Sequence, residues 1–195
     1  MSSTLAPVLS LDDLPSAELQ AARLDGDVYP LAGAYCLIGE LEAPRHRARA
    51  VLGERSRRLI AELSTAAWVW GATPHLGRLR FAVSPDARTR RPPDAGHALR
   101  EIVYEQDDVA SLDGLRVTAP LRTILDLARS DDAEPDETFV LRAANAGISL
   151  DDCLASLDAR PGIPSRAKAA ARLTRAWSRD VEGGAGQAVE TRYTS

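Results

Sequence analysis

One segment, residues 117–129, constrains the fold of this chain more than any other. Its sequence, VTAPLRTILDLAR, places Pro120 just after an alternating stretch that ends at Val117. Proline suits the first turn of a helix, because its missing N–H would have no acceptor within the helix there. Beyond it, apolar residues recur at positions i, i+3, i+4 and i+7, which form one face of a helix. The segment predicts a strand that leads directly into an amphipathic helix, with Thr118 as a capping residue.

The polar face of this predicted helix carries Arg122, Asp126 and Arg129. Arg122 and Asp126 are four residues apart, so an ion pair between them would stabilise the helix by about 0.2–0.5 kcal/mol. Two interpretations stay open. Either the pair only supports the helix, or Arg122 has a functional role and reaches a partner across the surface.

The same region carries a resemblance to a known family. GLRVTAPLRTILDLAR, residues 114–129, resembles the strand-to-helix signature of the abortive-infection AbiEi antitoxins, in their actinobacterial branch. LDGDVYPLAGAYCL, residues 24–37, resembles the hairpin that ends the family's short winged-helix part, and STAAWVWGA, residues 64–72, resembles its next landmark. The signature residues that we carry over are Pro120, Arg122, Thr123 and Asp126. The resemblance implies an antitoxin of a type IV toxin–antitoxin system, which represses its own operon and neutralises a nucleotidyltransferase-like toxin.

The N-terminal part departs from the family pattern by its length. A short helix is predicted over Ser16–Leu24, and strands over Val28–Leu31 and Ala34–Ile38 flank the turn pair Ala32-Gly33 as in a tight hairpin. A full winged helix needs about three helices before its wing, whereas only roughly 25 residues precede this hairpin. We therefore expect a truncated winged-helix-like part over residues 1–42, from which the recognition helix can be missing.

The middle of the chain predicts a mixture of helices and strands. The apolar spacing from Pro44 to Leu63 indicates a helix bent near Gly53, followed by a helical turn that Ser64 begins and Gly71 ends. Alternating patterns then predict strands over Leu79–Val83, Leu99–Tyr104, Val109–Leu112 and Leu115–Thr118, the last two joined by Asp113-Gly114. These elements favour an α+β fold in which a small, mostly antiparallel sheet packs with several helices.

The C-terminal part is predicted to be helical. Helices are expected around Glu137–Ala146, from a capping box at Ser149 over Leu150–Leu157, and over Ser165–Arg179. The expected organisation is an α+β antitoxin-like domain over residues 43–180 and a flexible tail over residues 181–195.

Arginines and one lysine collect in two regions, although the chain carries a net charge of -4. In the last predicted helix, cations recur at positions i, i+4, i+7 and i+11, and no acid interrupts residues 159–179. The predicted nucleic-acid-binding residues are Lys168, Arg172, Arg175 and Arg179 in this helix and Arg45, Arg47, Arg49, Arg57 and Arg58 in the other region. Such a row can follow a phosphate backbone and release counterions. The alternative is a solvated face or a surface for an acidic protein.

Motifs for catalysis, metal binding or cofactor binding are not found in the sequence. His46, His75 and His97 lack the spacing of a zinc site, and the sequence contains no Walker loop, no GxSxG and no GxGxxG after a strand. We therefore expect no catalytic residue, no metal, no cofactor and no enzymatic activity. No apolar run is long enough to span a membrane and the start lacks the pattern of a signal peptide, so we expect a cytoplasmic protein in which Cys36 and Cys153 are buried thiols.

Three functional hypotheses follow. The first is an antitoxin-like transcriptional regulator that binds DNA at its own promoter and also binds a toxin protein. The second is a non-catalytic protein-interaction module without DNA contact. The third is an accessory relative of Vsr-like endonuclease fusions, since VETRY, residues 189–193, resembles the point at which longer relatives continue into such a domain. The sequence carries no signal for the oligomeric state.

Overall fold

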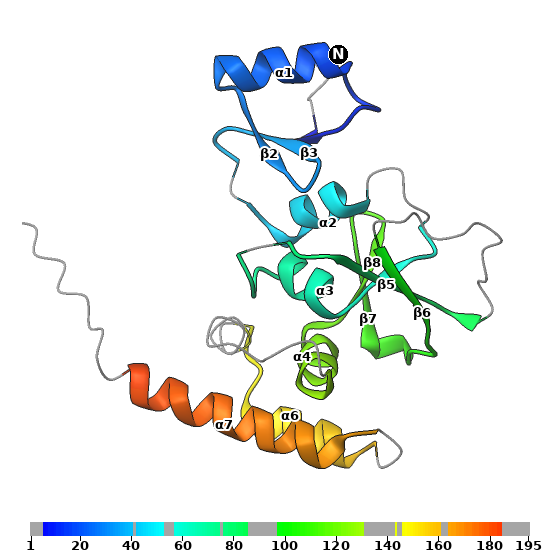
Figure 1. Cartoon of the computed structure of the whole chain (residues 1–195), viewed down its shortest axis with the longest axis vertical. Helices are drawn as coiled ribbons and strands as arrows, with labels where there is room; N and C mark the ends of the chain where they lie inside the picture. Colours follow the sequence, from blue (N-terminus) through cyan, green and yellow to red (C-terminus); the bar gives the residue numbers. More distant parts are fainter. Residues whose placement is uncertain are drawn as a thin grey trace, which may run out of the picture. The chain divides into compact units, whose positions relative to one another are not determined.

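The computed structural model describes residues 6–40, 42–52, 57–74, 76–85, 97–130, 143, 146–160 and 164–184. The chain divides into two units, Met1–Thr123 and Ile124–Ser195, which we describe separately. Within the described ranges, six α-helices and eight strands in two sheets form a mixed α+β fold (Figure 1). The predicted fold class is thereby confirmed. The expected domain boundaries at residues 42 and 180 stay predictions, and residues 185–195 of the expected tail lie outside the described ranges.

The first unit begins with a three-stranded sheet under a helix. Its strands are β1 (Val8–Leu9), β2 (Val28–Leu31) and β3 (Ala34–Leu37), in the order β1-β3-β2 with both pairings antiparallel, and α1 (Ser16–Asp25) lies between β1 and β2 in the sequence. The hairpin turns at Ala32 and Gly33, whose φ angles are 51° and 89°. Two left-handed residues of this kind match the right-handed twist of the strands. The predicted helix and hairpin are therefore confirmed.

The predicted helix over Pro44–Leu63 was wrong in its second half. Helix α2 is shorter, Pro44–Leu52, and Ile60–Ala61 form the strand β4. Both residues of β4 are buried, at 1% and 0% exposure, in the middle of a sheet. A short apolar run fits a buried strand as well as a helix, so periodicity alone could not separate the two. The next helix, α3 (Leu63–Val69), has Glu62 at its N-cap position and not Ser64 as expected.

A five-stranded sheet forms the centre of the first unit. It adds β5 (Leu79–Val83), β6 (His97–Glu101), β7 (Val109–Leu112) and β8 (Leu115–Thr118) to β4, in the order β6-β5-β4-β8-β7. Strands β4–β5 and β7–β8 pair antiparallel, whereas β4–β8 and β5–β6 pair parallel. Counting both sheets, four of the six described pairings are antiparallel, as predicted. Strand β6 ends at Glu101, so the expected strand over Leu99–Tyr104 was placed too late.

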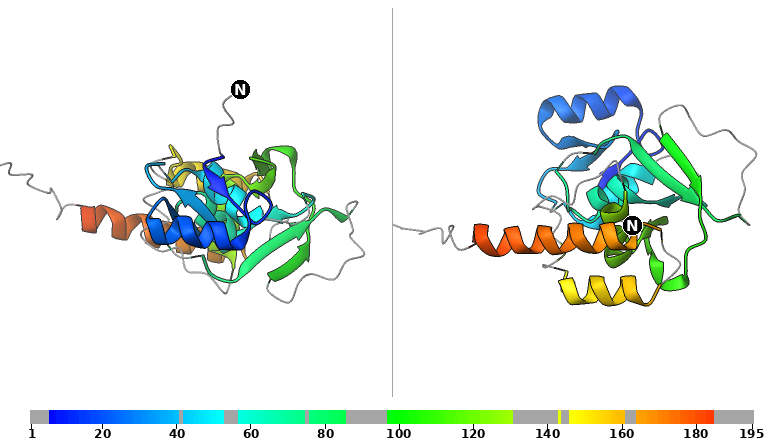
Figure 2. Two further views of the ribbon diagram at one scale, coloured as in Figure 1. Left: turned by 90° about the horizontal axis from the view of Figure 1, so that it is seen from above. Right: turned by 60° about the horizontal axis from the view of Figure 1, so that its bottom comes forward.

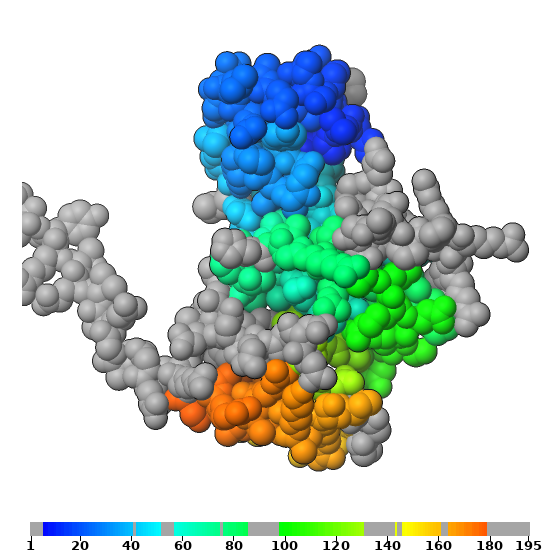
Figure 3. All heavy atoms as spheres, in the orientation of Figure 1, coloured from blue at the N-terminus to red at the C-terminus, as the bar shows by residue number. Residues whose placement is uncertain are grey.

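Both sheets of the first unit share one hydrophobic core. Cys36 of β3, Ala48 of α2, Trp68 of α3, Phe81 of β5 and Val117 of β8 belong to the same buried cluster, with exposures of 4% or less. Figure 3 shows that the N-terminal residues, in blue, continue without a break into those of α2 and the larger sheet. The hairpin is therefore packed as part of the unit.

The signature segment forms the predicted strand and helix. Strand β8 ends at Thr118 and α4 covers Pro120–Arg129, and the boundary between the two units falls within α4. The turn between β7 and β8 has φ angles of 45° at Asp113 and 84° at Gly114, which confirms the predicted hairpin.

The second unit is helical where it is described. Helix α6 (Leu150–Asp158) starts with the predicted capping box of Ser149 and Asp152, and α7 (Arg166–Gly184) extends further than the predicted helix. The two lie side by side in Figures 1 and 2, and Leu157 of α6 and Leu173 of α7 are buried at 1% and 0% exposure. The helix predicted around Glu137–Ala146 falls mostly outside the described residues. None of the described helices is long and apolar enough to cross a membrane.

Candidate functional site

Arg122 of the signature connects α4 to the segment that follows β6. Its Nη1 lies 2.6 Å from Oδ2 of Asp108, in the short 3-10 turn η2 (Gln106–Asp108), and its guanidinium stacks over the ring of Tyr104, 4.6 Å from the centroid. The side chains of Arg122 and Asp108 are only 11% and 4% exposed. A pair with so little water around it interacts more strongly than one on the surface. Arg122 therefore ties the start of α4 to the sheet.

Tyr104 also contacts a second ion pair, whose carboxylate is buried and whose arginine is half-exposed. Glu62, whose side chain is 0% exposed, accepts hydrogen bonds from Nε and Nη2 of Arg100, both at 2.7 Å, and from the hydroxyl of Tyr104 at 2.8 Å. Tyr104 thus faces Glu62 with its hydroxyl and Arg122 with its ring. We call the five side chains that are connected in this way the ion-pair network: Glu62, Arg100, Tyr104, Asp108 and Arg122.

Each of the two carboxylates in the ion-pair network is held by a guanidinium group. Two parallel N–H···O bonds from Arg100 fix the orientation of the Glu62 carboxylate. The network therefore positions α3, β6, η2 and α4 relative to one another. Among the residues that the structure describes, no group of three or more His, Cys, Asp or Glu side chains could hold a metal ion.

Sequence reasoning identified Arg122 and missed the other four members of the network. One signal could have pointed to Glu62, since it directly follows the apolar residues 59–61. A charge in such a run is buried only with a partner. The partner itself could not be read from the sequence, because Arg100 is 38 residues away.

The other signature residues also have structural contacts. Pro120 begins α4, and the buried hydroxyl of Thr123 lies 2.7 Å from that of Thr118 and donates to the Thr118 carbonyl at 2.9 Å. Thr118 is the last residue of β8 and meets Thr123 through its hydroxyl. Asp126, 6% exposed, pairs with Arg129 at 3.2 Å. The expected pair between Arg122 and Asp126 stays a prediction, as does a functional role for either residue.

Arg47, in the first basic region, is engaged within the fold. Its Nη1 donates to the carbonyl of Trp68 at 2.6 Å, its guanidinium lies 5.1 Å from the centroid of the Trp68 ring, and its Nε pairs with Glu42. The side chain of Arg47 is 17% exposed. It therefore joins α2 to α3.

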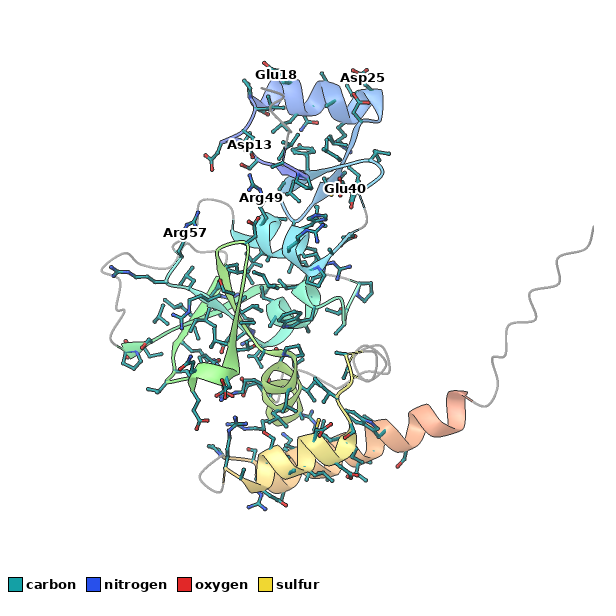
Figure 4. The ribbon with its side chains drawn as sticks, turned by 180° about the vertical axis from the view of Figure 1, so that it is seen from behind. Asp13, Glu18, Asp25, Glu40, Arg49 and Arg57 are labelled. Atoms are coloured by element: carbon teal, nitrogen blue, oxygen red, sulfur yellow. The ribbon has the colours of Figure 1, made fainter. Side chains whose placement is uncertain are left out.

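Arg49 connects the two sheets of the first unit. Its Nε donates to the carbonyl of Val8 at 3.0 Å, and it pairs with Asp13 at 3.3 Å and with Asp113 at 3.7 Å. Arg49 and Asp13 are labelled in Figure 4. Burial alone would raise the pKa of Asp13, but hydrogen bonds from Ser10 and the Arg49 guanidinium outweigh it and hold that pKa below its usual value. The other predicted residues of this region, Arg45, Arg57 and Arg58, have exposed side chains.

In the second basic region, Arg172 differs from its neighbours on α7. Its Nη1 donates to the carbonyl of Ala128 at 3.3 Å and to that of Ser130, so it caps the C-terminal end of α4. Lys168 and Arg175 are exposed, and Nε of Arg175 donates to the carbonyl of Ala171 in its own helix at 3.3 Å. The side chain of Arg179 lies outside the described part of the structure. The predicted row of cations therefore includes one residue with a structural role.

Comparison with known proteins gives two findings. Residues 59–138 match the family model described as the AbiEi antitoxin C-terminal domain, a range that includes the five-stranded sheet and α4. The crystal structure of the RV2827C protein from Mycobacterium tuberculosis is similar to the chain, with a TM-score of 0.46 and 17% sequence identity over 92% of this chain and 75% of that one. No match was found among curated proteins. Residues 59–138, which contain the signature segment, are therefore similar to the C-terminal domain of the AbiEi antitoxins.

Proposed function

We propose that this chain is a regulatory antitoxin that binds DNA at its own promoter and neutralises a nucleotidyltransferase-like toxin. The observation that carries the proposal is the AbiEi antitoxin C-terminal domain at residues 59–138. The family supports an antitoxin role in a toxin–antitoxin system, and therefore a regulatory rather than a catalytic role. A repressor of its own promoter acts in the cytoplasm.

Exposed cations on α7 support the DNA contact. Lys168 and Arg175 are both exposed and seven residues apart, which puts them on one side of the helix. Phosphate contacts of this kind give affinity that does not depend on sequence and weakens with salt. Arg172 is left out of the proposed contact because it caps α4.

The charges of the N-terminal helix α1 disfavour DNA contact by that helix. Helix α1 leads into the β2–β3 hairpin, as the last helix of a winged helix leads into its wing, but its exposed charges are Glu18, Asp25 and a single cation, Arg23. Acidic side chains are repelled by phosphate. We therefore assign the proposed DNA contact to α7 and not to α1.

Fluorescence anisotropy tests the DNA contact. The full chain is titrated onto duplex DNA from upstream of its gene and onto an unrelated duplex, at about 50 and 200 mM salt. The Lys168→Ala/Arg175→Ala variant should bind both duplexes more weakly and lower the salt slope by about 2, since each lost phosphate contact contributes about 0.9. Arg23→Ala/Arg78→Ala is the matched control, because it removes two exposed charges elsewhere. An unchanged salt slope in the α7 variant would remove that helix from the proposed contact.

A second candidate is a protein-interaction module without DNA contact. It is favoured by the intramolecular partners of Arg47, Arg49 and Arg172, which were expected to face nucleic acid. The same titration separates the two candidates, because this module would bind neither duplex at about 50 mM salt. Calorimetric titration with a purified nucleotidyltransferase-like toxin would then test the antitoxin role by itself.

A further inference from the structure

We propose that the outer face of α1 in one copy of the chain docks on the outer face of α7 in a second copy, with the acids of α1 against the cations of α7. The proposal concerns self-association and does not depend on the proposed DNA contact. It rests on the exposure, the charge and the spacing of residues on these two helices.

The outer face of α1 carries Glu18, Ala21 and Asp25, all exposed and spaced at i, i+3 and i+7. The opposite side of the helix is fixed to the hairpin, because Leu19 is 0% exposed and Nε2 of Gln20 donates to the hydroxyl of Tyr35 at 2.7 Å. Figure 4 shows Glu18 and Asp25 toward the two ends of α1, on the side turned away from the hairpin. This face is therefore accessible to a partner in the described structure.

The outer face of α7 repeats this spacing with the opposite charge. Lys168, Ala171 and Arg175 are exposed and also stand at i, i+3 and i+7. Ala169 and Leu173, both 0% exposed, define the buried side of this helix. An alanine lies between the two charged residues on each helix, so neither face presents a large side chain at its centre.

The two faces can therefore be matched residue for residue. Seven residues of helix span about 10.5 Å, so each acid of α1 can meet one cation of α7 when the helices lie alongside. In the antiparallel orientation, which also aligns the helix dipoles favourably, Glu18 meets Arg175 and Asp25 meets Lys168. The central Ala21 and Ala171 allow the axes to approach to about 8–10 Å.

Neighbouring residues set the expected strength of the contact. Leu24, which is 86% exposed, stands next to Asp25 and adds apolar area. Exposed ion pairs contribute little individually and are screened by salt. We therefore expect weak, salt-sensitive association.

Sedimentation velocity on the full chain, without DNA, tests the proposal. Runs at concentrations from about 10 to 300 µM and at about 50 and 500 mM salt should show association that rises with concentration and weakens with salt. Glu18→Lys/Asp25→Lys and Lys168→Glu/Arg175→Glu each place like charges opposite one another, so each variant alone should associate about 10-fold more weakly or worse. In an equimolar mixture, every contact between a copy of one variant and a copy of the other again pairs opposite charges, so association should recover.

The control variant is Asp12→Lys/Asp107→Lys, which makes the same change in net charge at exposed acids outside α1 and should leave association unchanged. Circular dichroism melts check that every variant is folded. Three results would each overturn the proposal: a chain that stays monomeric at low salt over the whole concentration range, a control variant that weakens association as much as the α1 variant, or a mixture of the swapped variants that does not recover association.

Discussion

Arg100 and Glu62 form a two-pronged ion pair across the boundary between solvent and core: both N···O distances are 2.7 Å, yet the Arg100 side chain is 46% exposed and that of Glu62 is 0% exposed. The carboxylate is thus fully desolvated and depends on a guanidinium that water still reaches. The hydroxyl of Tyr104 is the third donor to the same carboxylate. Stability of the first unit should therefore be sensitive to the removal of either donor residue.

Replacing Arg100 by Ala should lower the free energy of unfolding by about 2–3 kcal/mol, because it leaves a buried charge with Tyr104 as its remaining donor from the network. Arg100→Lys keeps the charge but loses the two-pronged geometry, so its loss should be intermediate. Urea denaturation, monitored by tryptophan fluorescence, measures the free energy of unfolding of both variants. Unchanged stability of Arg100→Ala would show that the pair contributes little to folding.

Arg122→Ala should also destabilise the chain, by about 2–3 kcal/mol, because the buried carboxylate of Asp108 loses its guanidinium and Tyr104 loses the stacked cation. Arg78→Ala, which removes an exposed arginine, should change stability by less than about 0.5 kcal/mol. Denaturant titrations of the two variants provide the comparison. If Arg122→Ala unfolds like the control, the interpretation of Arg122 as a structural residue fails.

Arg172 and Arg175 are only three residues apart, but replacing each of them by alanine should change stability by different amounts. Arg172→Ala removes the donor to the last carbonyls of α4 and should cost about 1–2 kcal/mol. Arg175→Ala should cost less than about 0.5 kcal/mol, since its side chain is exposed. Thermal melts of both variants measure the difference. Equal melting temperatures would remove the capping role of Arg172 and return it to the candidate DNA contact.

The Cys153 thiol should be unreactive in the native protein. Burial, and secondarily the negative charge of Asp152, raises the pKa of Cys153 to about 12. An unfolded cysteine has a pKa of about 8.5, so the stability that the neutral thiol provides is complete below that pH and is lost as the pH rises toward 12. In a Cys36→Ala background, reaction with a thiol reagent at about pH 8 should be slow in buffer and fast in denaturant. Fast labelling of the folded protein would contradict this.

The stabilisation that the capping box of α6 provides should weaken in acid. Hydrogen bonds from the hydroxyl and the backbone N–H of Ser149 lower the pKa of Asp152 below its usual value. Because the folded pKa is the lower one, the stabilisation is present above the unfolded pKa and is lost as the pH falls through the folded pKa. Between about pH 6 and pH 3, the melting temperature of the Asp152→Asn variant should therefore fall less than that of the native chain. Parallel acid dependence of the two proteins would exclude a role for this carboxylate.

Predictions from the sequence were accurate where the signal is local. The hairpins at Ala32-Gly33 and Asp113-Gly114, the helix Pro120–Arg129 and the capping box at Ser149 are all found in the structure. The prediction for Ile60 was wrong, because its apolar neighbours fit both periods and only its place between two strands made it a strand residue.

The sequence by itself determined the hairpin turns, the start of α4 at Pro120, the capping box of α6 and the α+β class, because these depend on residues within a few positions of one another. The tertiary structure alone decided which charges are paired. Glu62 and Arg100, Arg47 and Trp68, and Arg172 and Ala128 are separated by 38, 21 and 44 residues. No local pattern specifies such partners, since only the packing of distant elements brings a buried carboxylate or carbonyl within reach of one arginine among many.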